Sequence, residues 1–200
     1  MAIIFLVLFM ILAALNWFAA WRGRQDIEYI VKPAATAALV LFSAAGGHPS
    51  FLLIAALTLC LLGDVFLMLP GNYFLAGLSA FLLGHLAYIG LFPSAVAARL
   101  PWFLVMSAAT LPVTIPVLRS IKETGLKVGV VVYMGVICFM AGSAIASGSL
   151  LAVSGALLFV VSDALIAWDM FVRKLPRAHF WVMVTYHIAL LGLVLALRGF

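Results

Sequence analysis

Apolar runs, each long enough to cross a lipid bilayer, follow one another along almost the whole 200-residue chain. A helix needs about 20 mostly apolar residues to span the hydrocarbon of a membrane. Hydrophobic residues make up 68% of the chain and charged residues 8%, whereas a soluble domain has about 25% charged residues. The sequence therefore predicts an all-α, polytopic bundle that forms a single integral membrane domain over residues 1–200.

Eight transmembrane helices account for the chain and leave no room for a separate soluble domain. We expect them at residues 2–20, 28–45, 50–69, 72–92, 101–118, 127–147, 149–171 and 179–197. The first run has no basic segment before it, unlike a secretory signal, so we expect it to be retained as a helix. Pro101 is expected to begin the fifth helix, and Pro112 and Pro116 to kink it.

The basic residues favour one orientation in the membrane. With the N-terminus outside, the outer segments contain two of them, Arg99 and Arg198, and the inner segments nine. The inner ones are Arg22, Arg24, Lys32, Arg119, Lys122, Lys127, Arg173, Lys174 and Arg177. This positive-inside pattern predicts that both termini lie outside, and a bacterial source would place the protein in the plasma (inner) membrane. Because the basic residues lie between helices, and not in a cluster with aromatics, no nucleic acid partner is expected.

Two of only six acidic residues, Asp64 and Asp163, lie inside apolar runs. A charge at membrane depth costs roughly 2.5–3.5 kcal/mol on insertion scales, so such residues usually face a cavity or a partner and have a function. Gly63-Asp64 and Ser162-Asp163 each follow an apolar run, and each is followed on the next helix by a histidine, His85 or His187. This weak echo suggests a 4+4 internal repeat, which would place both aspartates on helices of the same direction.

Depth estimates bring these side chains toward one level of the membrane. At 1.5 Å per residue, Asp64 lies roughly 8 Å from the cytoplasmic end of its helix, Asp163 and His187 roughly 12 Å, and Tyr133 roughly 9 Å. We expect several helices to contribute to one polar site, together with Lys32 at the start of the second helix.

The aromatic and histidine side chains support this site in part. His85 and Tyr88 are three residues apart and share one helix face, whereas Tyr186 and His187 are adjacent and point about 100° apart. One of the latter two is expected to pack. Asp169 is expected to pair with basic residues near it. The remaining polar or sulfur side chains are expected at membrane ends, as for His48 and His179, or in the core, as for Cys60 and Cys138.

A set of different short motifs is spaced along nearly the whole chain. They are Lys32-Pro33, Gly63-Asp64 followed by Leu67-Met68, Gly77-Leu78-x-Ala80-Phe81 with His85 and Tyr88, Ser162-Asp163, and Thr185-Tyr186. This set resembles the YhhN family of membrane proteins, whose characterised members are lysoplasmalogenases. The resemblance implies an enzyme that cleaves the vinyl ether bond of alkenyl-glycerophosphocholine or alkenyl-glycerophosphoethanolamine and releases a fatty aldehyde and a glycerophospho-alcohol.

The residues suit that reaction. Vinyl ether cleavage begins with protonation of the outer alkene carbon and continues with capture of an oxocarbenium ion by water, so one acid and one base are needed. Our hypothesis is that Asp64 and Asp163 are the catalytic pair, with the division of work between them left open. Lys32 could bind the substrate phosphate as a point charge. The side chains expected to bind or orient the lysophospholipid are His85, Tyr88, Tyr133, Ser162, Tyr186 and His187; membrane lipids are the other expected partners, and the oligomeric state is open.

Three alternatives remain. A zinc centre would need an aspartate ligand, because only His85 and His187 lie deep in the membrane and no His-Glu-x-x-His motif is present; we expect no metal and no cofactor. A transporter of small molecules or lipids could use the same aspartates to relay protons or bind a cation, although the polar groups cluster in the cytoplasmic half. In a noncatalytic lipid-binding or assembly protein, the aspartates would form hydrogen bonds between helices.

Overall fold

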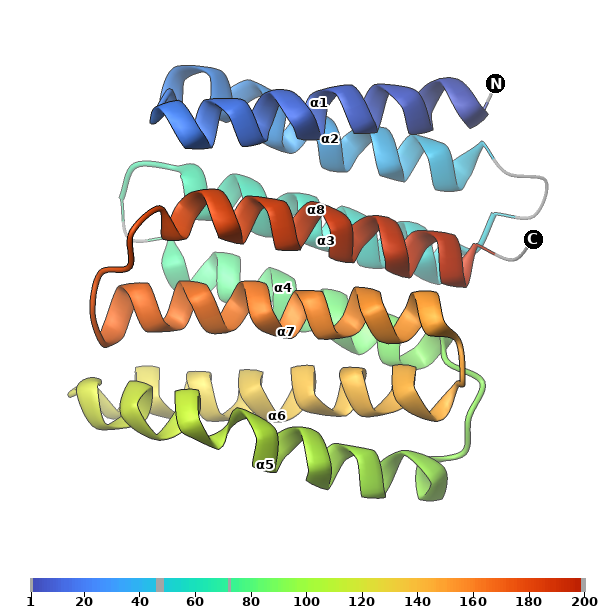
Figure 1. Ribbon diagram of the computed structural model, residues 1–200. Coiled ribbons are helices and arrows are strands. Elements are labelled where there is room, and N and C mark those ends of the chain that lie inside the picture. The colour runs from blue at the N-terminus through green and yellow to red at the C-terminus, as the bar shows by residue number, and fades with distance from the viewer. Residues whose placement is uncertain (1, 46–48, 72, 199–200) are drawn as a thin grey trace. The chain divides into compact units, whose positions relative to one another are not determined.

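The computed structural model describes residues 2–45, 49–71 and 73–198, and within them the chain forms eight α-helices (Figure 1). These are α1 (Ala2–Arg22), α2 (Gln25–Ala44), α3 (Phe51–Met68), α4 (Phe74–Leu91), α5 (Val96–Ser120), α6 (Thr124–Ala146), α7 (Leu150–Phe171) and α8 (Ala178–Leu197). Each is long and apolar enough to cross a membrane. The predicted all-α, multi-pass membrane protein is confirmed; His48 lies outside the described residues.

The helix boundaries differ from the predicted spans at several ends. Helix α2 begins at Gln25, three residues before the predicted residue 28, with Asp26 and Glu28 in its first turn. Acidic side chains are favourable there because they interact with the positive end of the helix dipole. Helix α6 begins at Thr124 instead of residue 127, which places every residue of α6 deeper along the helix than the sequence suggested.

The prediction that Pro101 begins the fifth helix is wrong, because α5 begins at Val96. Arg99 explains the earlier start: its guanidinium donates hydrogen bonds to the carbonyl oxygens of Phe92 at 2.6 Å and Ser94 at 2.8 Å. These bonds hold the connection from α4 against the first turn of α5.

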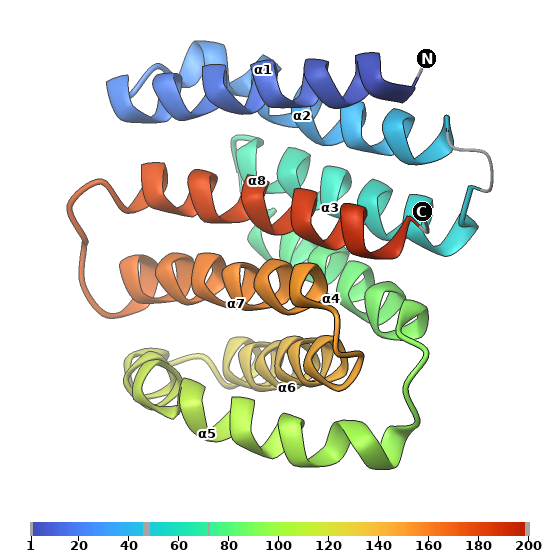
Figure 2. The ribbon, with the colours of Figure 1, turned by 45° about the vertical axis from the view of Figure 1, so that its right-hand side comes forward.

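Helix α5 also changes direction along its length, as Figure 2 shows. Two prolines lie inside its second half, Pro112 and Pro116. Each removes a backbone hydrogen bond and crowds the preceding turn. The predicted kink is therefore present.

The helices group into two compact units. The first contains α1–α4 and the last residues of α8, and the second contains α5–α7 and the rest of α8. The prediction of one integral membrane domain over the whole chain stays a prediction. The two aspartates belong to different units, Asp64 to the first and Asp163 to the second.

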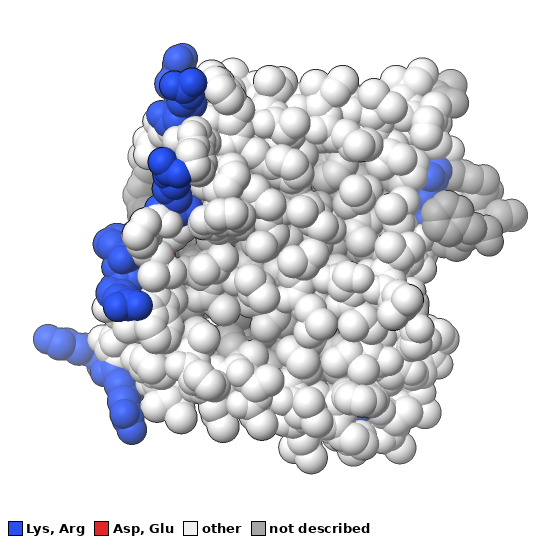
Figure 3. Space-filling model, in the orientation of Figure 1, with Lys and Arg blue, Asp and Glu red and all other residues white. Residues whose placement is uncertain are grey.

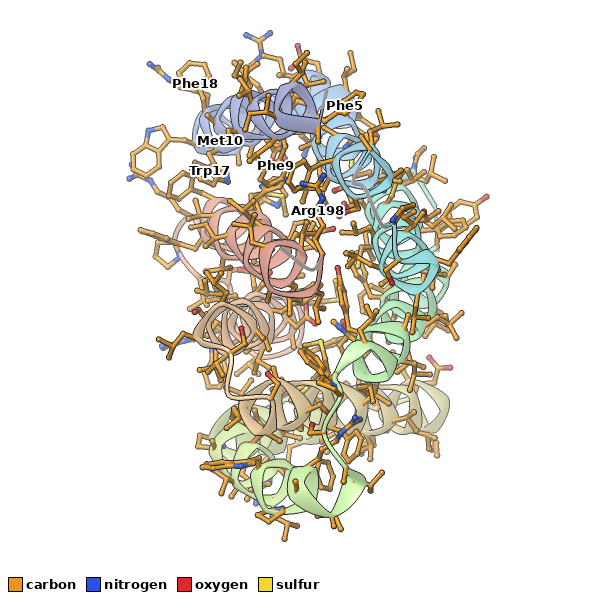
Figure 4. The ribbon with its side chains drawn as sticks, turned by 90° about the vertical axis from the view of Figure 1, so that its right-hand side faces the viewer. Phe5, Phe9, Met10, Trp17, Phe18 and Arg198 are labelled. Carbon is orange, nitrogen blue, oxygen red and sulfur yellow. The ribbon has the colours of Figure 1, made fainter. Side chains whose placement is uncertain are left out.

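Helix α2 of the first unit packs against both α1 and α3, and α3 packs against α4. Glycines set the α3–α4 approach: a Cβ on Gly63 would lie 2.6 Å from the Phe81 ring, and one on Gly84 would lie 3.3 Å from the Cys60 sulfur. The bare backbone of Gly63 thus admits the Phe81 ring directly beside Asp64. At the far end of α2, the Arg198 guanidinium, labelled in Figure 4, lies 3.7 Å from the centre of the Phe42 ring.

In the second unit, α6 packs against α5 and α7. A Cβ on Gly142 of α6 would lie 2.8 Å from the backbone nitrogen of Phe103 in α5. On the other side of α7, a Cβ on Gly192 of α8 would lie 3.1 Å from the Gly155 Cα. Small residues thus let the backbones approach closely, which is typical of helix packing in membranes.

Basic side chains gather toward one end of the helices in each unit, as the face drawn in Figure 3 shows. In the first unit, Arg22 and Arg24 lie around the α1–α2 turn. In the second unit, basic residues occupy the α5–α6 and α7–α8 connections: Arg119, Lys122, Lys127, Arg173, Lys174 and Arg177. The distribution within each unit agrees with the positive-inside pattern, while the placement of both termini outside stays a prediction.

We expect Gly142→Ala to destabilise the protein by about 1–3 kcal/mol, the usual cost of overpacking, because the nearest atoms belong to the α5 backbone and cannot rotate away. Gly135 of the same helix is the matched control, since nothing lies within 4 Å of a Cβ there. Thermal unfolding in detergent should show a lower midpoint for Gly142→Ala alone. Equal midpoints for the two variants would contradict the close α5–α6 contact.

Candidate functional site

The Asp64 carboxylate lies at the centre of a buried polar cluster in the first unit. Its Oδ1 is 3.2 Å from the Lys32 ammonium nitrogen, and the Thr36 hydroxyl donates a 2.8 Å hydrogen bond to its Oδ2. The side chains of Lys32 and Asp64 are 7% and 1% exposed. The sequence predicts Lys32 near the polar site as a ligand of the substrate phosphate, and in the structure it forms an ion pair with Asp64.

Helix periodicity explains why α2 presents both partners. Lys32 and Thr36 are four residues apart and therefore share a face. Glu28 precedes them by one turn and Ser43 follows by about two turns on the same face, and all four side chains are buried. We call these four residues the polar stripe of α2. A buried polar face on a membrane helix is costly unless its groups have partners.

A hydrogen bond from Tyr29 fixes the register between α2 and α3. Its hydroxyl donates to the carbonyl oxygen of Met68 at 2.6 Å. Met68 is the last residue of α3, where helical carbonyls have no partner within the helix. The bond therefore both caps α3 and holds the polar stripe level with Asp64.

His85 and Tyr88 of α4 lie further from the loop end of the helix than Asp64 does. The α3–α4 register places Gly63 against Phe81 and Cys60 against Gly84. His85 is therefore about 8 Å beyond the level of Asp64 along the helix, at 1.5 Å per residue. Both side chains are fully buried. Their predicted part in substrate binding stays a prediction.

The second carboxylate, Asp163 of α7, accepts a 2.5 Å hydrogen bond at Oδ2 from the hydroxyl of Tyr133 in α6. The early start of α6 places Tyr133 about 13 Å along its helix, close to the roughly 12 Å of Asp163 from the end of α7. The sequence estimate of 9 Å for Tyr133 was too shallow because it began α6 three residues late. The corrected depth explains why the two side chains meet.

Three further predicted residues lie at the α7–α8 contact. The Ser162 hydroxyl donates a 3.2 Å hydrogen bond to the Val182 carbonyl, and the Tyr186 ring packs edge-on against Phe159 at 5.6 Å. His187 is 1% exposed. These contacts join α7 to α8 beside Asp163, and the predicted substrate roles of these residues stay predictions.

The two aspartates occupy equivalent positions on their helices. Ser50 and Ser149 cap α3 and α7, each accepting a 3.3 Å hydrogen bond from a backbone N–H three residues on. Asp64 and Asp163 each stand thirteen positions after the first residue of their helix. In both units the carboxylate is held by the preceding helix, α2 or α6. This correspondence supports the proposed 4+4 repeat.

Sequence reasoning missed Thr36, Glu28 and Asn16. Thr36 could have been found, since a residue four positions after Lys32 shares its helix face. Glu28 was overlooked because the predicted helix began at that residue. Asn16 is an uncharged amide in an otherwise apolar run, so a search for charged residues within the spans does not include it.

Residues outside the two clusters behave largely as expected. Cys60 and Cys138 are buried free thiols. Asp169 pairs with the Lys174 ammonium at 2.8 Å and accepts a hydrogen bond from the Leu175 backbone N–H, so the predicted local pairing is confirmed. Among the described residues, no three His, Cys, Asp or Glu side chains are grouped so that they could hold a metal ion.

These observations define a multi-pass helical membrane protein with a buried ion pair in one unit and a partly buried carboxylate–phenol pair in the other. The chain belongs to the YhhN family, because the model of that family matches residues 27–197. Lysoplasmalogenase TMEM86B of Mus musculus is 32% identical over 196 residues, covering 94% of this chain and 85% of that protein. Lysoplasmalogenase TMEM86B of Homo sapiens is 33% identical over 187 residues, covering 92% and 78%. No solved structure shows a significant match.

Lys32→Met should destabilise the protein by about 3–5 kcal/mol, because it leaves a buried carboxylate without its cation. The double change Lys32→Met with Asp64→Asn should recover much of that loss, since it removes both charges. Lys174→Met is the control: Lys174 also pairs with an aspartate, but its side chain is 83% exposed, so the change should cost about 1 kcal/mol or less. Unfolding in detergent measures all three, and additive effects of the Lys32 and Asp64 changes would argue against a coupled pair.

Proposed function

We propose that this protein hydrolyses the vinyl ether bond of lysoplasmalogens within the membrane. Membership of the YhhN family and similarity to proteins named lysoplasmalogenase support the reaction. The observation that carries the mechanism is the pair of unlike carboxylates, a buried Asp64 beside an ammonium and a partly buried Asp163 beside a phenol. A lysophospholipid is the substrate, and no cofactor takes part.

Asp64 is the base in this proposal. Attraction from the Lys32 ammonium and the hydrogen bond from Thr36 both stabilise the ionised carboxylate. An ionised carboxylate near an oxocarbenium ion lowers the energy of that cation and accepts a proton from the attacking water. Lys32 is already paired with Asp64, so its contribution is to hold this charge state, and contact with the substrate phosphate is not required.

Asp163 is the acid. The role of the acid falls to Asp163 in this proposal because Asp64 lies beside the Lys32 ammonium, whereas the Asp163 carboxyl group lies beside a neutral phenol. The Tyr133 hydroxyl donates to Oδ2, which fixes the orientation of the Asp163 carboxyl group. Tyr133 thus positions the acid without touching the substrate.

The two groups complete one turnover with balanced protons. Asp163 gives its proton to the outer alkene carbon, and the electron pair of the alkene forms the new C–H bond. Water attacks the oxocarbenium carbon as Asp64 takes a proton from it, which gives the hemiacetal. Asp64 then returns that proton to the ether oxygen, the C–O bond breaks, and Asp163 takes the hydroxyl proton of the forming aldehyde. Both carboxyl groups end in their starting states.

Asp64→Asn and Asp163→Asn should each lower aldehyde release from lysoplasmalogen by about 10²–10⁴-fold, the usual contribution of a general acid or base. The double variant should be about as slow as the slower of the two single variants. The effects of residues that act as a unit on the rate do not add. Asp26→Asn is the matched control, since Asp26 is an exposed carboxylate paired with Arg24. Aldehyde formation by purified protein in detergent measures each rate.

Three outcomes would count against the proposal. Full activity of either aspartate variant removes that residue from the mechanism. Equal release of products from an ester-linked lysophospholipid would indicate a different hydrolase. Absence of product from both substrates would favour the transporter or the lipid-binding alternative.

A further inference from the structure

Helix α1 carries one buried amide that nothing else in the first unit explains. Its buried residues are Phe9, Ala13, Asn16 and Ala19, a spacing of three to four that defines one helix face. Phe9, labelled in Figure 4, marks this face. Asn16 is 0% exposed, and it is flanked on the face by alanines.

Neither polar atom of the Asn16 amide has a hydrogen-bond partner among the described residues. An asparagine inside a membrane helix usually bonds to a neighbouring helix, and a buried amide without a partner lowers stability. Leucine has nearly the same shape and would avoid this cost. The orphaned amide therefore points to a ligand that completes its hydrogen bonds.

The α1–α2 turn places Asn16 level with the Asp64 cluster. The backbone N–H of Arg24 donates to the Ala19 carbonyl at 2.9 Å and closes this turn. Asn16 lies six residues before the end of α1 and Lys32 seven residues after the start of α2. Both are therefore about 10 Å from the same turn, at 1.5 Å per residue, and α1 packs along α2.

We propose that the Asn16 amide binds the free sn-2 hydroxyl of the lysophospholipid and so makes α1 a determinant of specificity for the lyso form. This inference rests on the proposed function. The sn-2 hydroxyl is on the carbon next to the one that bears the ether oxygen, so a group level with the reacting carboxylate meets it. A hydroxyl has one donor and accepts through its oxygen, which matches the carbonyl and NH₂ of an amide.

A second acyl chain at sn-2 removes the donor and adds bulk, so a diradyl lipid leaves the amide unsatisfied. Sites that bond a substrate hydroxyl reject analogues without it, because their own buried groups are then left unpaired. The match to the YhhN family begins at residue 27, after the end of α1, so it assigns no role to Asn16.

The test compares two lipids that the enzyme does not cleave: a saturated 1-alkyl-2-hydroxy-glycerophosphocholine and its 2-deoxy analogue. The protein should bind the hydroxyl form about 10–100-fold more tightly, the range expected for satisfying one buried amide. Asn16→Leu should bind both lipids equally, with an unfolding midpoint at or above that of the unchanged protein. Ser143→Ala is the control, because Ser143 is also fully buried but belongs to α6 of the second unit, where its hydroxyl donates to the Phe139 carbonyl; it should keep the preference.

Two results overturn the inference. One is an unchanged preference in Asn16→Leu. The other is a lower unfolding midpoint together with equally weakened binding of both lipids, seen both in Asn16→Leu and in Asn16→Ser. That result would show that the Asn16 amide serves packing and not binding. Release of aldehyde from lysoplasmalogen tests the proposed function separately: preference for the hydroxyl lipid without aldehyde release supports the binding site and overturns the reaction.

Discussion

The ion pair between Lys32 and Asp64 is the interaction on which the first unit depends. Removing both charges from water costs several kcal/mol per ion, and only close geometry with further hydrogen bonds repays it. The Thr36 hydroxyl provides one such bond, and the Tyr29–Met68 bond holds α2 and α3 in the register that the pair requires. A slip of one residue between these helices would leave a charge unpaired in the apolar core. The pair therefore specifies the packing of α2 against α3 as well as providing the charged group that the proposed reaction needs.

The second carboxylate shows how equivalent positions acquire different properties. Asp64 and Asp163 stand at the same distance from serine-capped helix starts, and each faces the preceding helix. What differs is the partner on that helix, an ammonium in α2 and a phenol in α6. A cation favours the ionised form more strongly than a neutral donor does. The different partners on the preceding helices thus give the two carboxylates different surroundings, which is the basis of the proposed division into base and acid.

The eight-helix fold and the importance of the two aspartates could be predicted from the sequence, because each follows from a large energetic cost. Long apolar runs leave a helix as the only way to satisfy the backbone in lipid, and a charge inside such a run demands a partner. Pro101 was misjudged because local sterics favour proline in a first turn, while the bonds from Arg99 to loop carbonyls fix the start earlier. The depth of Tyr133 was misjudged for a related reason, since helix ends depend on capping contacts. Thr36 is uncharged, so hydropathy gave no signal for it.

The first unit places several costly features at one level of the bundle. Lys32 and Asp64 are buried charges, and Asn16 is a buried amide whose polar atoms have no described partner. Packing alone would favour apolar side chains at all three positions, and the close glycine contact of Gly63 with Phe81 shows that α3 and α4 can pack tightly without polar groups. The Asn16 amide is the group of this kind that a binding site can use, because a group that awaits a ligand cannot also be satisfied by the protein. In the site proposed above, the sn-2 hydroxyl of a lysophospholipid would satisfy the Asn16 amide, and its alkenyl chain would meet the apolar remainder of the helices.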